Sequence, residues 1–162
     1  MVSDEKINVW NELYKIPDPE IPMLTIGELG VLRKVENHDG TWYVYITPTY
    51  SGCPAMHMFE EEIKRVMETH RWIPFEIKTI YHPAWTTDWL SEEAKEKLRK
   101  AGIAPPEGSA SKKALLGEPD EVTCPKCGKK DTKKISEFGS TACKALYFCN
   151  NCKDPFEYFK CL

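Results

Sequence analysis

Four cysteines near the C-terminal end of the chain constrain its fold more than any other feature. They form two Cys-x-x-Cys pairs, Cys124 with Cys127 and Cys149 with Cys152, and 21 residues separate the pairs. Each pair can wrap a tight turn that directs two thiolates at one cation, and a hairpin between the turns brings the four sulfurs together as a tetrahedron. A segment of about 40 residues is too short to bury a sufficient core by itself, so metal binding would supply much of its folding free energy. The sequence therefore predicts an all-β metal ribbon over residues 122–162.

The ribbon spacing favours zinc, because zinc takes four thiolates in a closed tetrahedral shell. Four thiolates can also hold an iron–sulfur cluster, so the sequence leaves both occupants open. Cys143 and Cys161 lie in the same module and are left over. They are either small buried side chains or further ligands that handle a second metal or exchange a ligand. A thiol oxidoreductase that uses Cys124 and Cys127 is disfavoured, because the matching second pair makes these cysteines metal ligands.

The composition excludes several classes of protein. Of the 162 residues, 41% are hydrophobic and 29% are charged, which is typical of one globular domain plus a small module. No apolar run reaches the roughly 18 residues of a membrane span, and the N-terminus has no signal-peptide pattern. We therefore expect a cytoplasmic protein whose cysteines are metal ligands or reactive thiols, not disulfides. Residues 1–111 carry a net charge of −6 and residues 112–162 carry +3, which argues against nucleic-acid binding.

The first 104 residues show the hydrophobic periods of a small α+β layer. We expect helices over residues 4–15 and 56–70, and strands over residues 31–36, 42–47 and 75–81. An Asp-Gly pair between the first two strands is a hairpin signal. The order strand, helix, strand then implies a right-handed crossover and a parallel pair. The expected fold class is therefore α+β, a small three-stranded sheet covered by helices, followed by the all-β ribbon.

The domain boundaries follow from composition. Ser91 is expected to cap a short helix that ends at Gly102. The stretch 105–121 is rich in Pro, Gly, Ser, Ala and Lys, and we interpret it as an interdomain linker. The predicted domains are therefore 1–104 and 122–162.

Cys53 is the second candidate functional residue. It stands between Gly52 and Pro54, directly before an amphipathic helix, and proline suits the first helical position. Cys53 would then be the N-cap, where the positive helix end and nearby N–H groups lower a thiol pKa. A buried structural cysteine is the alternative. No His and Asp partners lie nearby in sequence to make Cys53 a hydrolytic nucleophile.

The stretch Asp18-Pro19-Glu20 holds two carboxylates between prolines. Turn chemistry explains such a stretch. The two carboxylates could also bind a partner, or contact a metal or Cys53.

Five short motifs resemble the small α+β domain shared by SufT-like and related iron–sulfur assembly factors. They are Asp18-Pro19-Glu20-Ile21-Pro22, Ile26-Gly27-Glu28-Leu29-Gly30, Thr47-Pro48-Thr49, Gly52-Cys53-Pro54 and Pro83-Ala84-Trp85-Thr86. The stretches 139–145 and 154–161 resemble the C-terminal module of the PaaD (PaaJ) family of the aerobic phenylacetate pathway. Both halves match in order, so the resemblance covers nearly the whole chain.

This resemblance implies an accessory factor for iron–sulfur cluster assembly or insertion, not an enzyme. The implied task is to mature the reductase component of the oxygenase that epoxidises the ring of phenylacetyl-CoA. Cys53 is then the functional thiol, which would carry transient iron or an iron–sulfur cluster, and Asp18 and Glu20 form an acidic motif. The resemblance implies that the structural zinc ligands of the ribbon are Cys124, Cys127, Cys149 and Cys152. Cys143 and Cys161 match two further cysteines of this family.

The expected partners are the iron–sulfur reductase and other cluster-assembly proteins, and a homodimer is left open. Nucleic acid and membranes are not expected as partners. The alternative function is that of a zinc-ribbon scaffold or subunit of the oxygenase complex that handles no cluster. That alternative predicts zinc only and an unreactive Cys53.

Overall fold

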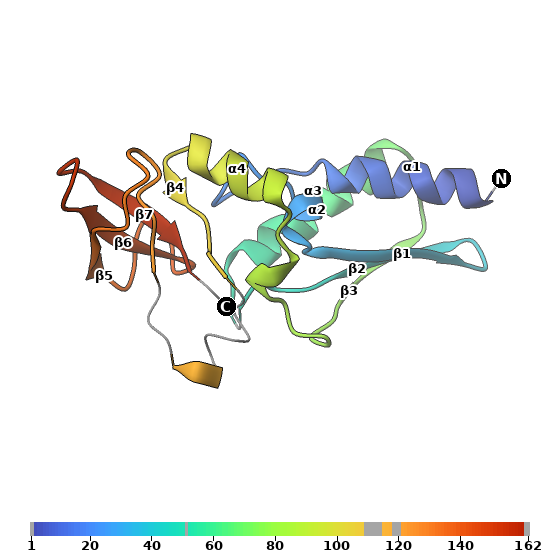
Figure 1. Ribbon diagram of the computed structural model, residues 1–162. Helices are drawn as coiled ribbons and strands as arrows, with labels where there is room; N and C mark the ends of the chain where they lie inside the picture. The colour runs from blue at the N-terminus through green and yellow to red at the C-terminus, as the bar shows by residue number, and fades with distance from the viewer. Residues whose placement is uncertain (1, 51, 109–114, 118–120, 161–162) are drawn as a thin grey trace. The chain divides into compact units, whose positions relative to one another are not determined.

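The computed structural model of the protein describes residues 2–50, 52–108, 115–117 and 121–160 (Figure 1). The chain forms two compact units, residues 1–85 and 86–162. The predicted boundary at residue 104 differs from this division. In this division β4 (Ile103–Ala104), a two-residue strand, pairs with a strand of the ribbon sheet, and the helix over Glu92–Lys100 contacts β4, so both belong to the second unit. The predicted linker, 105–121, lies in part outside the described residues.

The first unit contains three helices and three strands among its described residues. They are α1 (Val2–Tyr14), α2 (Ile26–Leu29), β1 (Leu32–His38), β2 (Thr41–Ile46), α3 (Ala55–Thr69) and β3 (Phe75–Thr79). The strand order is β1-β2-β3, with β1 antiparallel and β3 parallel to the central strand. These pairings confirm the predicted hairpin and the predicted parallel crossover through α3.

The hairpin between β1 and β2 follows from its turn residues. Asp39 and Gly40 both have a positive φ, 50° and 84°. Such backbone angles match the two-residue turn that twists with its strands, and Asp-Gly is among the pairs that adopt it most readily. The Asn37 side chain accepts a hydrogen bond from the Gly40 N–H at 3.2 Å. The short-range sequence signal is therefore sufficient to fix this turn.

One face of the sheet lies in the core of the first unit. Along β2 the side chains of Trp42, Val44 and Ile46 are buried and the alternate ones are partly exposed. The helices supply the other half of this core, with buried side chains at Val9, Leu13, Phe59, Ile63 and Met67. Helix α1 begins at Val2, two residues before the predicted start at residue 4.

The opposite face of the sheet carries two tyrosines of β2 under lysine ammonium groups. Lys78 Nζ lies 4.5 Å from the centre of the Tyr43 ring, and Lys34 Nζ lies 4.8 Å from that of Tyr45. Lys34 also pairs with Glu36 at 2.9 Å. Cation–π contacts and an ion pair within β1 therefore keep this face polar.

The second unit is built on a four-stranded sheet. Its elements are η1 (Thr87–Trp89), α4 (Glu92–Lys100), β4, β5 (Thr132–Ser136), β6 (Lys144–Cys149) and β7 (Pro155–Phe159). The strand order is β4-β7-β6-β5, with β4 parallel to β7 and the other neighbours antiparallel. A small core of buried side chains lies in this unit, at Ala104, Val122, Ala145, Tyr147, Phe156 and Tyr158 together with Cys124 and Cys149.

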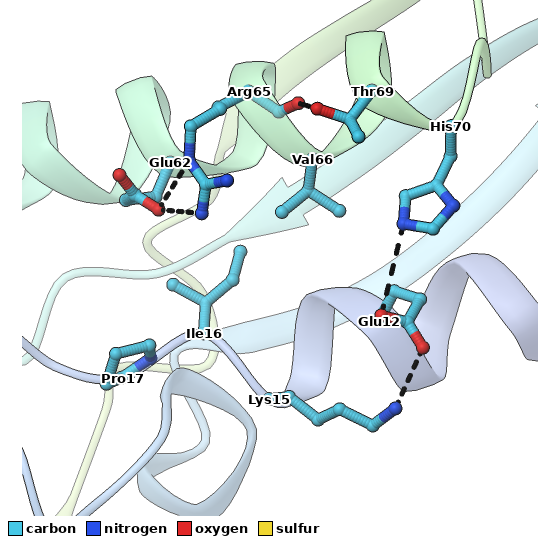
Figure 2. Close-up of a pocket in the computed structure, with 9 residues that line it drawn as sticks. All are labelled: Glu12, Lys15, Ile16, Pro17, Glu62, Arg65, Val66, Thr69 and His70. Carbon is cyan, nitrogen blue, oxygen red and sulfur yellow. Dashed lines mark hydrogen bonds and ion pairs between the residues drawn. The ribbon is translucent and has the colours of Figure 1, made fainter.

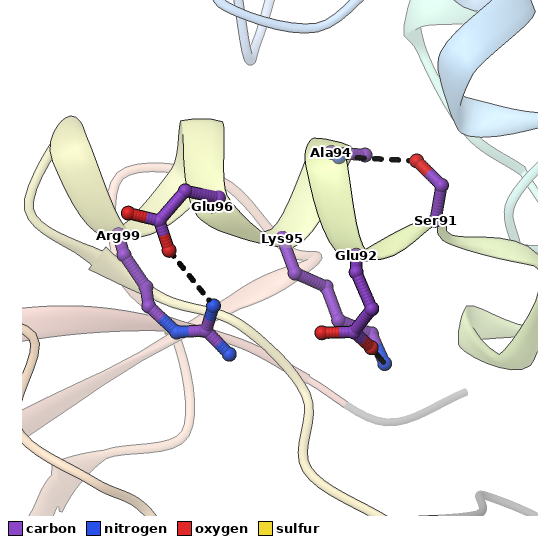
Figure 3. Close-up of polar contacts among 6 residues, drawn as sticks. All are labelled: Ser91, Glu92, Ala94, Lys95, Glu96 and Arg99. Atoms are coloured by element: carbon purple, nitrogen blue, oxygen red, sulfur yellow. Dashed lines mark hydrogen bonds and ion pairs between the residues drawn. The ribbon is translucent and has the colours of Figure 1, made fainter.

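Helix α4 has the predicted cap. The Ser91 hydroxyl accepts a hydrogen bond from the Ala94 N–H at 3.1 Å, as Figure 3 shows. Two pairs spaced three residues apart, Glu92 with Lys95 and Glu96 with Arg99, lie along its exposed side at 3.1 and 3.0 Å. The described part of the chain holds no helix that is both long enough and apolar enough to cross a membrane.

Candidate metal centre and thiol site

The two Cys-x-x-Cys pairs form matching turns. In the first turn the Gly128 N–H donates to the carbonyl of Cys124 at 2.9 Å, and the Cys124 N–H donates to the carbonyl of Lys129 at 2.9 Å. The second turn repeats both bonds at 3.0 Å, from Lys153 to Cys149 and from Cys149 to Asp154. The residue after each second cysteine has a positive φ, 72° at Gly128 and 61° at Lys153. The same backbone geometry therefore presents each pair of sulfurs.

The four sulfurs of Cys124, Cys127, Cys149 and Cys152 lie within 4.8 Å of one another. Cys124 Sγ is 3.8 Å from Cys152 Sγ, and Cys127 Sγ is 3.5 Å from Cys149 Sγ. A tetrahedral zinc ion with Zn–S bonds of about 2.3 Å needs sulfurs roughly 3.8 Å apart, which is close to both of these separations. Within the described residues, no other group of three or more potential ligands from His, Cys, Asp and Glu comes together in this way.

The protonation of this cluster also points to a cation. The backbone N–H of Lys129 is the main reason that the pKa of Cys127 falls to about 7, so one thiolate forms readily. Burial, followed by hydrogen bonds to Cys149 and Cys124, raises the pKa of Cys152 to about 12. Adjacent thiolates repel one another, so the full set of four ionises only around a positive ion.

Of the two remaining ribbon cysteines, Cys143 lies among the described residues and is not part of this cluster. Cys143 is buried just before β6, and its sulfur lies 3.0 Å from the Thr141 hydroxyl. Cys161 lies outside the described residues. Their suggested role as further ligands stays a prediction.

Cys53 lies in the turn that connects β2 to α3, but one residue earlier than predicted. Pro54 is the N-cap of α3, and Gly52, with φ 77°, turns the chain toward the helix. The Cys53 side chain is 8% exposed. Thr49 Oγ1 lies 4.0 Å from its sulfur and donates a weak hydrogen bond.

The predicted low pKa of Cys53 is wrong. Burial raises the pKa of this thiol above its usual value, and the nearby carboxylate of Glu20 adds to the rise. Hydrogen bonds from the Ala55 N–H and the Thr49 hydroxyl act in the opposite direction, but they do not outweigh the burial. Cys53 is therefore a protonated thiol at neutral pH.

The two carboxylates of the Asp18-Pro19-Glu20 stretch have different environments. Asp18 is buried, and its Oδ1 accepts hydrogen bonds from the N–H groups of Glu20 at 2.7 Å and of Ile21 at 2.9 Å. Asp18 thus organises the turn, as the turn interpretation predicts. Glu20 is half-buried and close enough to Cys53 to change its pKa. The structure therefore brings Glu20 to Cys53 while Asp18 holds the loop.

A pocket of about 150 Å³ lies beside the Cys53 turn, at the ends of the parallel strands β2 and β3. Sequence reasoning missed it, although the carboxyl ends of parallel strands are where such crevices form. Tyr50 is one wall and also contacts Cys53, because its carbonyl accepts a hydrogen bond from the Cys53 N–H at 3.3 Å. The full lining is Thr47, Pro48, Thr49, Tyr50, Tyr81, Ala84 and Trp85.

A larger pocket of about 260 Å³ lies between α1 and α3, as Figure 2 shows. Its charged side chains pair with one another, Lys15 with Glu12 at 2.8 Å and Arg65 with Glu62 at 2.6 Å. His70 Nε2 lies 4.0 Å from the other oxygen of Glu12. None of the described residues around this pocket is a cysteine, so it offers no thiol for metal handling.

Two family models match this chain. One is described as an iron–sulfur cluster assembly protein and matches residues 6–72, and the other is described as a PaaD zinc beta ribbon domain and matches residues 108–160. The first contains Cys53 and the second contains the four clustered cysteines.

Similar proteins agree with these matches. The chain is 49% identical over 154 residues, 95% of its own length and 92% of the relative's, to an Escherichia coli (strain K12) protein that is named as one subunit of a "Putative 1,2-phenylacetyl-CoA epoxidase". It is 30% identical over 95 residues, 57% of its length and 92% of the relative's, to the Fe-S protein maturation auxiliary factor YitW of Bacillus subtilis (strain 168). Among solved structures, a domain of unknown function, DUF59, from Bacillus anthracis matches with a TM-score of 0.54 and 23% identity, over 59% of this chain and 92% of that one. This last likeness concerns the fold alone.

Proposed function

This chain belongs to the PaaD family, and on that premise we propose that it is a non-catalytic accessory factor for iron–sulfur cluster assembly or insertion. The observation that carries the proposal is the place of Cys53. It is the only cysteine in the first 85 residues, and it lies in the part that the assembly-protein model matches. Relatives of this part, among them YitW of Bacillus subtilis, are themselves named Fe-S protein maturation auxiliary factors.

The proposed role of Cys53 is to hold iron for a short time. Iron binds the thiolate, so the Cys53 proton leaves to solvent as the iron–sulfur bond forms. On delivery, a thiolate of the receiving protein replaces Cys53 on the iron, and Cys53 takes up a proton again. The raised pKa of Cys53 favours this release, because a more basic thiolate binds a proton more strongly. No electron is transferred in this exchange.

The ligand set around Cys53 is incomplete, and this suits a transfer factor. A stable cluster needs about four protein ligands, whereas the first unit has a single cysteine. The remaining ligands would come from the donor, the receiver or a second copy of the chain. We propose that the receiver is the reductase component of the phenylacetyl-CoA oxygenase. The name of the Escherichia coli relative supports a link to a phenylacetyl-CoA epoxidase, and the choice of the reductase rests on the resemblance of the sequence to the PaaD family.

The ribbon has a separate, structural role in this proposal. Zinc bound by the four cysteines would hold the two turns together and supply folding free energy to the second unit. No step of cluster transfer passes through this zinc.

The test is cluster loading of the reductase by protein purified without oxygen. Cys53→Ser should keep its zinc and its fold but lose most of the loading rate. Cys143→Ser is the matched control, because it removes a thiol of similar burial from the other unit. Loading by Cys53→Ser at the native rate would remove Cys53 from the mechanism.

The second candidate function is a zinc-ribbon component of the oxygenase complex, which is favoured because the Escherichia coli relative is named as part of an epoxidase. It predicts about one zinc per chain, stable association with the oxygenase and no effect of Cys53→Ser. Loss of loading by that variant, without stable association, would exclude it.

A further inference from the structure

The pocket beside Cys53 is the feature that the proposed function leaves unused. It is formed where β2 and β3 end, so two consecutive strands of the sheet fix its two sides. Thr49 lines the pocket and also donates to the Cys53 sulfur. A group bound in the pocket would therefore be separated from the thiol by the Thr49 side chain.

The size and the walls of the pocket suit one six-membered aromatic ring. Its volume is about 150 Å³, and a cavity of about 150 Å³ in another protein binds benzene. Three of its seven lining residues are aromatic, Tyr50, Tyr81 and Trp85. Trp85 is a fixed wall, because it is buried and its Nε1–H donates to the carbonyl of Leu29 at 2.7 Å. Aromatic walls favour an aromatic guest through edge-to-face contacts.

The charge of the pocket distinguishes a protein side chain from a small acidic molecule. Among the described residues that line it, none has a charged side chain. An arylacetate or an acyl-CoA would need cations for its carboxylate or phosphates, whereas a phenylalanine or tyrosine side chain needs none. Tyr81 is 65% exposed at the rim, where an arriving polypeptide can reach it.

We propose that this pocket receives one aromatic side chain of the protein that accepts the cluster, and that it aligns that protein's cysteines with Cys53. The inference rests on the proposed function. Tyr81 is then a specificity-determining residue, and Ala84 is an exposed residue of the lining at which a larger side chain would occupy the pocket. A ring held this way converts the exchange of iron between two thiolates into a positioned reaction.

The first test measures ring binding directly, without any cluster. Toluene and p-cresol stand for the phenylalanine and tyrosine side chains, and binding is followed by saturation-transfer NMR on the full chain. We expect both to bind in the millimolar range, and phenylacetate to bind about tenfold more weakly or not at all. Ala84→Leu should abolish ring binding, since it fills the pocket from an exposed position. Ala101→Leu, at another exposed alanine, is the matched control and should bind as the native chain does.

The second test measures how the pocket affects transfer of the cluster to the reductase. Ala84→Leu should slow loading of the reductase about tenfold. Tyr81→Ala should slow loading by a similar factor, whereas Tyr81→Phe should load the reductase at the native rate. Cys53→Ser should stop loading and leave ring binding unchanged, so the pocket and the thiol are measured separately.

Each failure has a distinct meaning. Absence of ring binding, or equal binding of phenylacetate, would overturn the aromatic side-chain assignment without affecting the test of Cys53. Native loading by Ala84→Leu would overturn the role of the pocket in alignment. Failure of the native chain to load the reductase would overturn the proposed function, and with it the assignment of the pocket to a receiving protein.

Discussion

The two cysteine turns of the ribbon contain matched positions at which substitutions should change the zinc affinity in opposite directions. Gly128 and Lys153 follow the second cysteine of their respective pairs, and each donates its N–H to the carbonyl of the first. Both have a left-handed backbone, φ 72° and 61°. Only one of the two is glycine, the residue that adopts this conformation without steric cost. We predict that Gly128→Ala weakens zinc binding and that Lys153→Gly strengthens it.

The size of each effect follows from backbone terms alone. A left-handed conformation costs a residue with a Cβ about 1–2 kcal/mol, and glycine loses about 0.5–1 kcal/mol more chain entropy on folding than alanine does. A Cβ added at Gly128 meets no atom within 4 Å, so no steric clash is added. The difference is about 0.5–1 kcal/mol, a loss for Gly128→Ala and a gain for Lys153→Gly. Metal binding and folding of such a ribbon are coupled, so the zinc dissociation constant should change roughly two- to fivefold in opposite directions.

The assay is competition for zinc between the full chain and a chelator of known affinity at fixed pH. Lys129→Gly is the control, because Lys129 lies beside Gly128 but does not have a positive φ. That variant should weaken zinc binding slightly, through chain entropy only. The reasoning is refuted if Lys153→Gly weakens zinc binding as Lys129→Gly does, or if Gly128→Ala binds zinc with native affinity.

Two further predictions concern the buried ion pair and the thiol. Lys144 Nζ lies 2.7 Å from the Glu157 carboxylate, and the two side chains are 5% and 24% exposed. Lys144→Met should lower the free energy of unfolding by about 3 kcal/mol, because it leaves the partly buried Glu157 carboxylate without its cation. Adding Glu157→Gln should recover part of that loss, and urea unfolding in which the single variant matches the native chain would contradict the argument. Only the thiolate form of a cysteine reacts with iodoacetamide. The raised pKa of Cys53 therefore predicts that iodoacetamide alkylates Cys53 more slowly at pH 7 than an ordinary thiol. The alkylation rate should rise only as the pH passes the usual range of thiol pKa values. Glu20→Gln should move this profile to lower pH, since it removes a negative charge that raises the pKa of Cys53. Peptide-resolved mass spectrometry showing no difference between the two chains would count against an electrostatic effect of Glu20 on Cys53.

The sequence predicted those parts of the fold that depend on short-range signals. The turn at Asp39-Gly40, the period of α3 and the cap at Ser91 each involve a few neighbouring residues whose preferred conformation agrees with the fold. The strand β4 was not predicted, because a strand of two residues is too short to show an alternating hydrophobic pattern. Its place beside β7 is decided by burial of Ile103 and Ala104 in the ribbon sheet.

The sequence alone determined the cluster of four cysteines, because the spacing of these residues itself encodes the two turns that bring the four sulfurs together. It also identified Cys53 by its place before a helix, but it gave the wrong direction for the pKa. That direction depends on how deeply the thiol is buried and on how close Glu20 comes to it, 33 positions away in the chain. Desolvation and the pocket of Tyr50, Tyr81 and Trp85 arise only when β2 and β3 pair, so the tertiary structure decided them.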